Sequence, residues 1–159
     1  MEHSAVNFGA AAAEFYGEFA AFEGDSLGMA LRTLSNDAVF VRQSEDLLEF
    51  DARLDLLRRL ALASRVPDSL AAELDVILAT AKKLSERRSE LLQAVWSGDE
   101  VQSLSTHREI GARGFPGRRE QFICLHSIPQ LDTYAQEARE LKRALRDLAG
   151  RMDAHRRHS

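Results

Sequence analysis

The stretch from Pro67 to Trp96, PDSLAAELDVILATAKKLSERRSELLQAVW, decides the fold. Its apolar residues recur at alternating steps of three and four positions, which is the spacing of one face of an α-helix. The positions on this face are Leu70, Leu74, Ile77, Ala81, Leu84, Arg88, Leu91 and Val95. The spacing predicts a long amphipathic central helix over residues 67–97, against which the rest of the chain packs.

Arg88 is the charged residue on this otherwise apolar face. A guanidinium among apolar side chains is unfavourable unless it is paired, hydrogen-bonded or directed into a polar cleft. Two interpretations follow. Arg88 forms a structural salt bridge to an acid on a neighbouring helix or subunit, or it contacts a phosphate or another anion.

The residues before the central helix predict two further helical units. In the first, over residues 5–35, apolar residues keep the helical spacing up to Gly24-Asp25, where the phase breaks, and resume it on a shifted face. The residues on the two faces are Phe8, Ala12, Phe15, Phe19 and Phe22, then Leu27, Leu31 and Leu34. Such a break predicts either one kinked helix or two helices end to end.

The second unit is expected over residues 44–65. Ser44 is followed by Glu45 and Asp46, which is typical of a helix start, because a hydroxyl caps free amides and acids favour the positive end of the helix dipole. Pro67 separates this helix from the central one, and so short a joint predicts an antiparallel pair. Residues 36–43 show no clear period and are assigned no structure.

After the central helix the pattern changes to short segments rich in β-branched and aromatic residues. These segments predict a β-hairpin over about residues 101–126, whose arms are joined by the glycine- and proline-containing segment 111–117. A last helix is expected over residues 128–154, followed by a basic, frayed tail. The predicted fold is mainly α, an up-down helical bundle of four to five helices with a small β-hairpin inserted before the last helix.

Composition limits the class of protein. The chain has 159 residues, 45% of them hydrophobic and 29% charged, which predicts one globular domain over residues 1–159. Cys124 is the single cysteine, and no apolar run approaches the roughly 18 residues of a membrane span. The acidic start of the chain differs from the basic start of a signal peptide. We therefore expect a soluble, cytoplasmic protein without membrane contact.

Charge is distributed unevenly along the chain. Residues 1–80 contain 14 acids and 6 bases, whereas residues 81–159 contain 11 acids and 15 bases, so that the halves carry −8 and +4. Such a split could make a basic face for an anion, but helix packing usually interleaves the two halves, and a solvated surface is the simpler interpretation.

Common cofactor and metal motifs are missing from the sequence. It contains no glycine-rich nucleotide loop, no Gly-x-Ser-x-Gly, no His-Glu-x-x-His and no calcium loop. The five histidines are scattered, and Glu14 with Glu18 or Glu45 with Glu49 lack the Glu-x-x-His partners of four-helix carboxylate sites. We expect neither a cofactor nor a metal.

The end of the central helix, RRSELLQAVW from Arg87 to Trp96, resembles the signature helix of the HEPN family (higher eukaryote and prokaryote nucleotide-binding domains). Small bacterial members tend to read Arg-Asn-x-x-x-His-Gly-x-Trp. The corresponding positions here are Arg88, Ser89, Gln93, Ala94 and Trp96. The likeness extends loosely to the preceding helix and to the order of helix pair, hairpin and last helix.

The resemblance implies a homodimer that meets through the central helix, with Arg88 and Trp96 at or near the interface. Gln93 stands where the family's catalytic histidine would act in RNA cleavage, and glutamine cannot transfer a proton near neutral pH. The expected function is therefore that of a non-catalytic HEPN-like domain with an interaction or ligand-sensing role. The candidate anion or interface site consists of Arg87, Arg88, Gln93 and Trp96.

Two other functions stay open. The chain could be an RNA-cleaving or nucleotide-related enzyme in which His107 or His126 from the hairpin replaces the missing histidine. It could also be a structural helical bundle whose likeness to the family is accidental. Trp96 is read as a core or interface anchor, with base stacking as the alternative.

Overall fold

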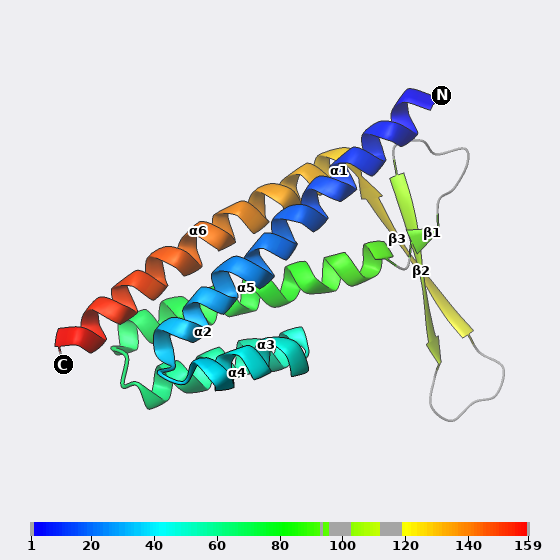
Figure 1. Cartoon of the computed structure of the whole chain (residues 1–159). Helices are drawn as coiled ribbons and strands as arrows, with labels where there is room; N and C mark the ends of the chain where they lie inside the picture. The colour runs from blue at the N-terminus through cyan, green and yellow to red at the C-terminus, as the bar shows by residue number, and fades with distance from the viewer. Residues whose placement is uncertain (1, 93, 96–102, 112–118, 159) are drawn as a thin grey trace.

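A single helical rod begins the structure. The computed structural model describes residues 2–92, 94–95, 103–111 and 119–158, with side chains for residues 8–92 and 126–158. The rod consists of α1 (Glu2–Ala21), a π-helix η1 (Phe22–Leu27) and α2 (Gly28–Leu34) (Figure 1). Because Ala21 and Gly28 keep helical backbone angles, the three segments join without a break. Of the two arrangements expected for residues 5–35, the continuous helix is the one observed.

The π-helix explains the shift of the apolar face at Gly24-Asp25. Phe22 and Leu27 are five residues apart, and both are fully buried. Five residues is the step of a π-helix, in which each amide bonds five positions back. One extra residue is therefore absorbed in η1, and both parts of the rod direct their apolar side chains toward the same core.

The next two helices differ from the expected unit over residues 44–65. Helix α3 covers Ala38–Leu47 and α4 covers Phe50–Ala63, so the predicted start at Ser44 is wrong. Asp37 caps α3 instead, since its Oδ1 accepts hydrogen bonds from the amides of Val39 and Phe40, each at 3.0 Å. The Ser44 hydroxyl lies inside α3 and donates to the carbonyl of Phe40 at 2.7 Å. Most of the unassigned segment 36–43 is thus helical.

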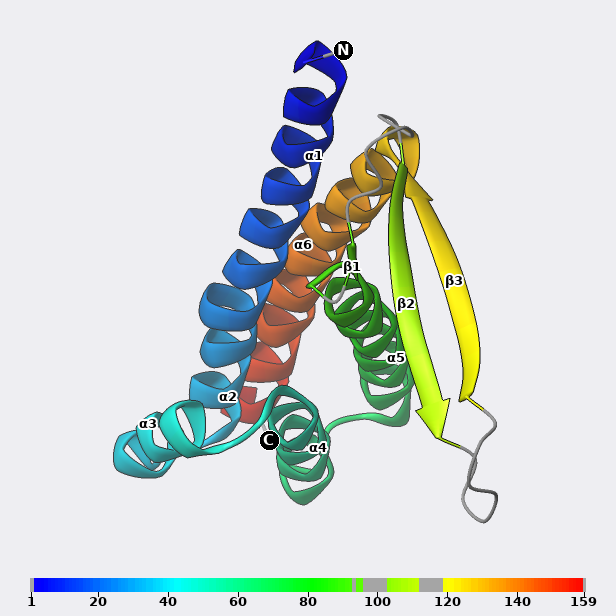
Figure 2. The ribbon, with the colours of Figure 1, turned by 90° about the vertical axis from the view of Figure 1, so that its right-hand side faces the viewer.

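The central helix α5 covers Asp68–Leu92, so the predicted end at residue 97 is wrong: Ala94 and Val95 form a short strand, and residues 93, 96 and 97 lie outside the described residues. The joint between α4 and α5 includes Arg65, whose φ of 52° is left-handed. The amide of Val66 bonds the carbonyl of Ala61, and that of Arg65 bonds the carbonyl of Leu62, which is the Schellman pattern of a helix end. The chain reverses there, and α4 and α5 run antiparallel as expected (Figures 1 and 2).

The sheet contains the expected hairpin and one further short strand. Strands β2 (Ser103–Gly111) and β3 (Arg119–Ser127) pair antiparallel, from Ser103 opposite Ser127 to Gly111 opposite Arg119. Strand β1 (Ala94–Val95), which the sequence analysis did not predict, pairs with β2 in the order β1-β2-β3. In Figures 1 and 2 the hairpin lies beyond the end of α5 and points away from the helices.

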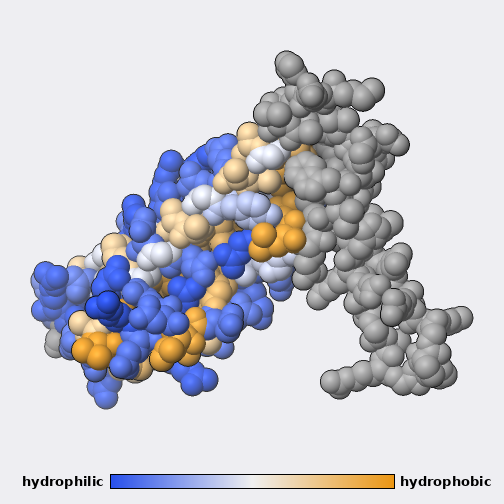
Figure 3. Space-filling view, turned by 45° about the vertical axis from the view of Figure 1, so that its right-hand side comes forward, coloured by the Kyte–Doolittle hydropathy of each residue, from blue (hydrophilic) through white to orange (hydrophobic). Residues whose placement is uncertain are grey.

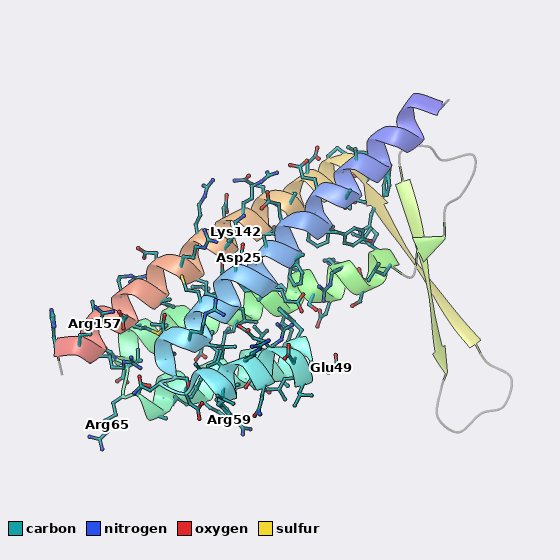
Figure 4. All side chains as sticks on the ribbon, in the orientation of Figure 1. Asp25, Glu49, Arg59, Arg65, Lys142 and Arg157 are labelled. Carbon is teal, nitrogen blue, oxygen red and sulfur yellow. The ribbon has the colours of Figure 1, made fainter. Side chains whose placement is uncertain are left out.

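Helix α6 covers Ile128–His158, so the tail expected to be frayed is part of the helix. Helix α6 runs antiparallel to α5 and parallel to α1, because the chain turns back between α5 and α6 through the hairpin (Figure 1). Contacts follow this direction: Glu18 bonds Lys142 at 2.9 Å, and Asp25 lies 3.8 Å from Arg146. Figure 4 labels Asp25 and Lys142 on these neighbouring elements.

The core confirms a mainly α helical bundle. It is filled by phenylalanines of the rod and by aliphatic residues of α4, α5 and α6. The largest fully buried side chains are Phe8, Phe15, Phe19, Phe22, Leu27, Leu31, Leu57, Leu74, Leu84, Leu131, Leu145 and Leu148. Among the described helices, none is long and apolar enough to cross a membrane.

Candidate functional site

Arg88 faces the interior of the bundle, as its place on the apolar face of α5 predicts. Its Nη1 donates to Oε2 of Glu23, in η1, at 2.7 Å. Its guanidinium carbon lies 4.5 Å from the ring centroid of Phe19, which is within the range of a cation–π contact. The side chain is 25% exposed, so Arg88 is neutralised inside the chain while part of it reaches solvent.

A second arginine meets the same carboxylate. Arg53, in α4, donates from Nη2 to Oε1 of Glu23, and its side chain is only 12% exposed. Its guanidinium carbon lies 6.0 Å from the ring centroid of Phe50. Glu23 therefore connects three elements through its two oxygens. We refer to Glu23, Arg53, Arg88, Phe19 and Phe50 as the Glu23 cluster.

The charges of the Glu23 cluster do not balance. Two guanidiniums surround one carboxylate, and Nε of Arg53 is buried without a hydrogen-bond partner among the described residues. Tyr16, one turn before Phe19 on α1, is close enough to respond to this charge. Burial raises the pKa of its hydroxyl, and the positive charge of Arg88 opposes that rise. The cluster is thus a partly buried site of net positive charge.

The π-helix positions the acid of this site. Glu23 directly follows the buried Phe22, and within η1 the chain turns by less per residue than in an α-helix. Its carboxylate faces α4 and α5 rather than solvent. Elements of this kind are frequent at functional sites. The break in phase at Gly24-Asp25 was the sequence signal for η1, but it did not single out Glu23.

Arg87, the other predicted site residue whose side chain is described, does not join the cluster. The side chain of Arg87 lies on a different side of α5 and pairs with Glu90 at 3.0 Å. Its guanidinium carbon is 6.0 Å from the ring centroid of Tyr134. Gln93 and Trp96 lie outside the described residues. Of the two candidates whose side chains the structure describes, Arg88 belongs to the Glu23 cluster and Arg87 does not. Sequence reasoning missed Glu23 and Arg53.

His126, at the end of β3, is the most buried histidine in the described part of the chain. Its side chain lies edge-on to Tyr134, and its Nε2 is 3.7 Å from Oε2 of Glu90. Neither ring nitrogen has a hydrogen-bond partner there, and burial lowers the pKa of the imidazole, against the charge of Glu90. With 2% of its surface exposed, His126 has no open path to a substrate. The side chain of His107 lies outside the described residues.

A groove marks the outer side of α4 and α5. Its volume is about 380 Å³, and its lining combines acids, bases and aliphatic groups. The lining residues are Asp51, Leu54, Asp55, Arg58, Asp75, Leu78, Ala79 and Lys82. Arg58 and Asp75 bridge it at 2.8 Å. No group of three or more metal-binding side chains occurs among the residues that the structure describes.

The chemistry available at the Glu23 cluster is charge pairing. Arginine stays protonated at any physiological pH, so it binds anions but does not transfer protons. Phenylalanine rings supply packing and cation–π contact.

Comparisons of the chain with known protein families, with curated proteins and with solved structures found no match. Proposals about function therefore rest on the geometry described above.

Proposed function

We propose that the chain is a non-catalytic, HEPN-like helical domain with an interaction or ligand-sensing role, and that it acts as a homodimer. The observation that supports this proposal is the internal pairing of Arg88. Arg88 is held by Glu23 and by the ring of Phe19, so its charge is already neutralised within the chain. An arginine held in this way supports the bundle, and it cannot act as a general acid or base in cleavage.

An RNA-cleavage assay tests the absence of activity. We expect no cleavage of labelled single-stranded RNA by the wild-type chain above a buffer control. Gln93→His restores the histidine of the motif and is the matched gain-of-function variant. Any cleavage by the wild type above the buffer control would refute the proposal, and Arg88→Ala would then show whether the activity depends on Arg88.

The outer face of α5 is the surface we propose for the dimer. It carries small and apolar residues between charged ones, and α4 adds an exposed leucine. The exposed residues are Ala72, Val76 and Ala79 on α5 and Leu62 on α4. Val76 is 67% exposed, which leaves it available to a partner. Arg88 lies on the opposite side of α5 and is neutralised by Glu23 within one chain, so the expected position of Arg88 at the dimer interface is not part of this surface.

Light scattering after size exclusion tests the dimer. At tens of micromolar we expect the mass of two chains for the wild type and of one chain for Val76→Glu, because a carboxylate in an apolar contact is strongly unfavourable. Ala154→Glu, at an exposed position of α6, is the control that adds the same charge away from α5. A monomeric wild type, or a dimer that Val76→Glu leaves intact, would contradict this part of the proposal.

An anion is the ligand that the Glu23 cluster fits best, should the role be sensing. The excess positive charge and the unpartnered Nε of Arg53 favour this second function. Inorganic phosphate at constant ionic strength is expected to raise the melting temperature of the wild type and not that of Arg88→Met. An equal rise in both proteins would exclude the cluster as the binding site.

A further inference from the structure

Helix α3 has an apolar face that nothing in the described structure covers. It is held to the bundle by Val41 and Ser44, which are buried, and by Glu45, which pairs with Arg32 at 2.9 Å. Its other side is exposed and unusually apolar for a solvated surface: Val39 is 66% exposed and Leu47 is 80% exposed, with Phe40 and Leu48 partly exposed beside them. Figure 3 shows apolar side chains at the lower edge of the molecule, where α3 and α4 lie.

The apolar residues form a stripe with charges along one edge. Residues of an α-helix follow one another at about 100°, so Val39, Gln43 and Leu47 lie one turn apart on the exposed face. Arg42 and Asp46 lie together on one edge of this stripe, and Phe40 lies on the other. Both charged residues are exposed, and neither forms an ion pair within the described part of the chain.

We infer that this stripe docks on the same stripe of a second copy of the chain, with the two α3 helices antiparallel across a two-fold axis. Such an axis at Gln43 sets Val39 opposite Leu47 of the partner subunit. On the charged edge it sets Arg42 beside Asp46 of the partner subunit, and the reciprocal pair forms on the other half. The exposed face therefore sets apolar residues opposite apolar residues and opposite charges beside one another when it meets a second copy of itself.

The opposite orientation is disfavoured by the same charges. A parallel pair would place each Arg42 beside the partner's Arg42 and each Asp46 beside the partner's Asp46. Like charges next to one another across an interface are repulsive, and they suppress wrong arrangements. The order of Arg42 and Asp46 along the helix thus selects the antiparallel dimer.

The contact is small, and this sets the expected affinity. Helix α3 has 10 residues and is about 15 Å long. One helix pair of this length buries less than the roughly 800 Å² per partner of a stable complex, so we expect association only at concentrations on the order of hundreds of micromolar. This association is independent of the proposed dimer through α5. Where both form, the chain has two isologous surfaces and assembles beyond a dimer.

Sedimentation equilibrium over about 20 to 500 µM tests the inference at the concentrations that such an interface requires. All proteins carry Val76→Glu, so that association through α5 does not contribute. We expect the parent to associate and Leu47→Glu to remain monomeric. Arg42→Asp alone and Asp46→Arg alone are each expected to weaken association about tenfold or more, because each creates two like-charge contacts.

The decisive experiment mixes the two charge variants. In a mixture, each Arg42→Asp chain meets an Asp46→Arg chain, and both edge contacts become attractive again. Association close to that of the parent is therefore expected for the mixture, and also for the double variant Arg42→Asp with Asp46→Arg. Circular dichroism spectra equal to that of the parent show that the variants fold.

Three results would overturn the inference. The first is a parent that stays monomeric over the whole range, which would leave the face to a different partner. The second is association that Leu47→Glu does not change. The third is association that Leu47→Glu removes but the two charge variants leave unchanged, because the contact would then lack the antiparallel pairing of Arg42 with Asp46.

Discussion

Replacing Glu23 by glutamine should destabilise the fold more than any other single charge change among the described ion pairs. Glutamine has the shape of glutamate but not its charge, so Arg53 and Arg88 would face one another without a carboxylate between them. Breaking a fully buried pair costs about 3 to 5 kcal/mol. The side chains of Glu23, Arg53 and Arg88 are between 12% and 25% exposed, so water partly screens their charges. The expected loss in the free energy of unfolding is therefore about 2 to 4 kcal/mol.

The assay is equilibrium unfolding in urea, followed by far-UV circular dichroism, together with a thermal melt. For a chain of this size 1 kcal/mol corresponds to roughly 2 to 4 °C, so Glu23→Gln should lower the melting temperature by about 4 to 16 °C. The urea m-value should stay constant, because the surface exposed on unfolding does not change.

A matched control separates this effect from ordinary surface charge. Glu14 pairs with Arg139 but is half exposed, and Glu14→Gln should cost less than about 1 kcal/mol. Arg88→Met should cost about 1 to 2 kcal/mol, because Glu23 keeps Arg53 and the methionine still covers the ring of Phe19. If Glu23→Gln lies within about 0.5 kcal/mol of the wild type, a range typical of exposed positions, the cluster is not a structural element and the reasoning fails.

Four further predictions concern single side chains. Arg65→Gly should raise the free energy of unfolding by about 1 kcal/mol in urea titrations, because glycine adopts the left-handed φ at the end of α4 without strain. Asp37→Ala should lower it by about 1 kcal/mol through loss of the α3 cap, and an unchanged urea midpoint would contradict that role. Leu145→Ala should cost about 2 to 5 kcal/mol by opening a cavity in the core, and no loss of stability would mean that α6 does not pack as described. Burial lowers the folded-state pKa of His126, so its contribution to stability should be lost as the pH falls below the unfolded value of about 6.5. The difference in melting temperature between the wild type and His126→Phe should shift in favour of the variant from pH 7.5 to 5.5, and a constant difference would refute this.

The sequence pattern predicted the long helices and the hairpin because their apolar faces are continuous. Leu74, Ala81 and Leu84 follow the helical spacing and are buried, as expected from one face of α5. The short segments rich in β-branched and aromatic residues correspond to β2 and β3. In α5 the local spacing and the tertiary packing agree, so the pattern is informative by itself.

Helix α3 escaped prediction for a physical reason. Val41 is its only large buried apolar residue, whereas Val39, Phe40 and Leu47 face solvent. The hydrophobic pattern of residues 36–43 therefore lacks the period of a helix that packs on a core. Its capping residue, Asp37, was the available signal, but β-branched residues follow it and weaken the local preference for a helix.

The site could be predicted only in part, because its members are far apart in the sequence. The apolar face of α5 showed that Arg88 needed a partner, but not which of the many acids would supply it. Glu23 lies 65 residues before Arg88, and Arg53 is 30 residues from Glu23. Which helices meet depends on the tertiary arrangement, and Arg53 reaches Glu23 because α4 packs against both α2 and α5.

The π-helix has a consequence for how this chain tolerates a change in its length. Because η1 accommodates one surplus residue, removing a single residue there, such as Gly24, would let α1 and α2 merge into one uninterrupted α-helix with their core-facing residues still in phase. The same deletion inside α1 would rotate everything before it by about 100° and turn its phenylalanines away from the core. The rod therefore tolerates the deletion of one residue within η1, but that deletion would change the orientation of Glu23.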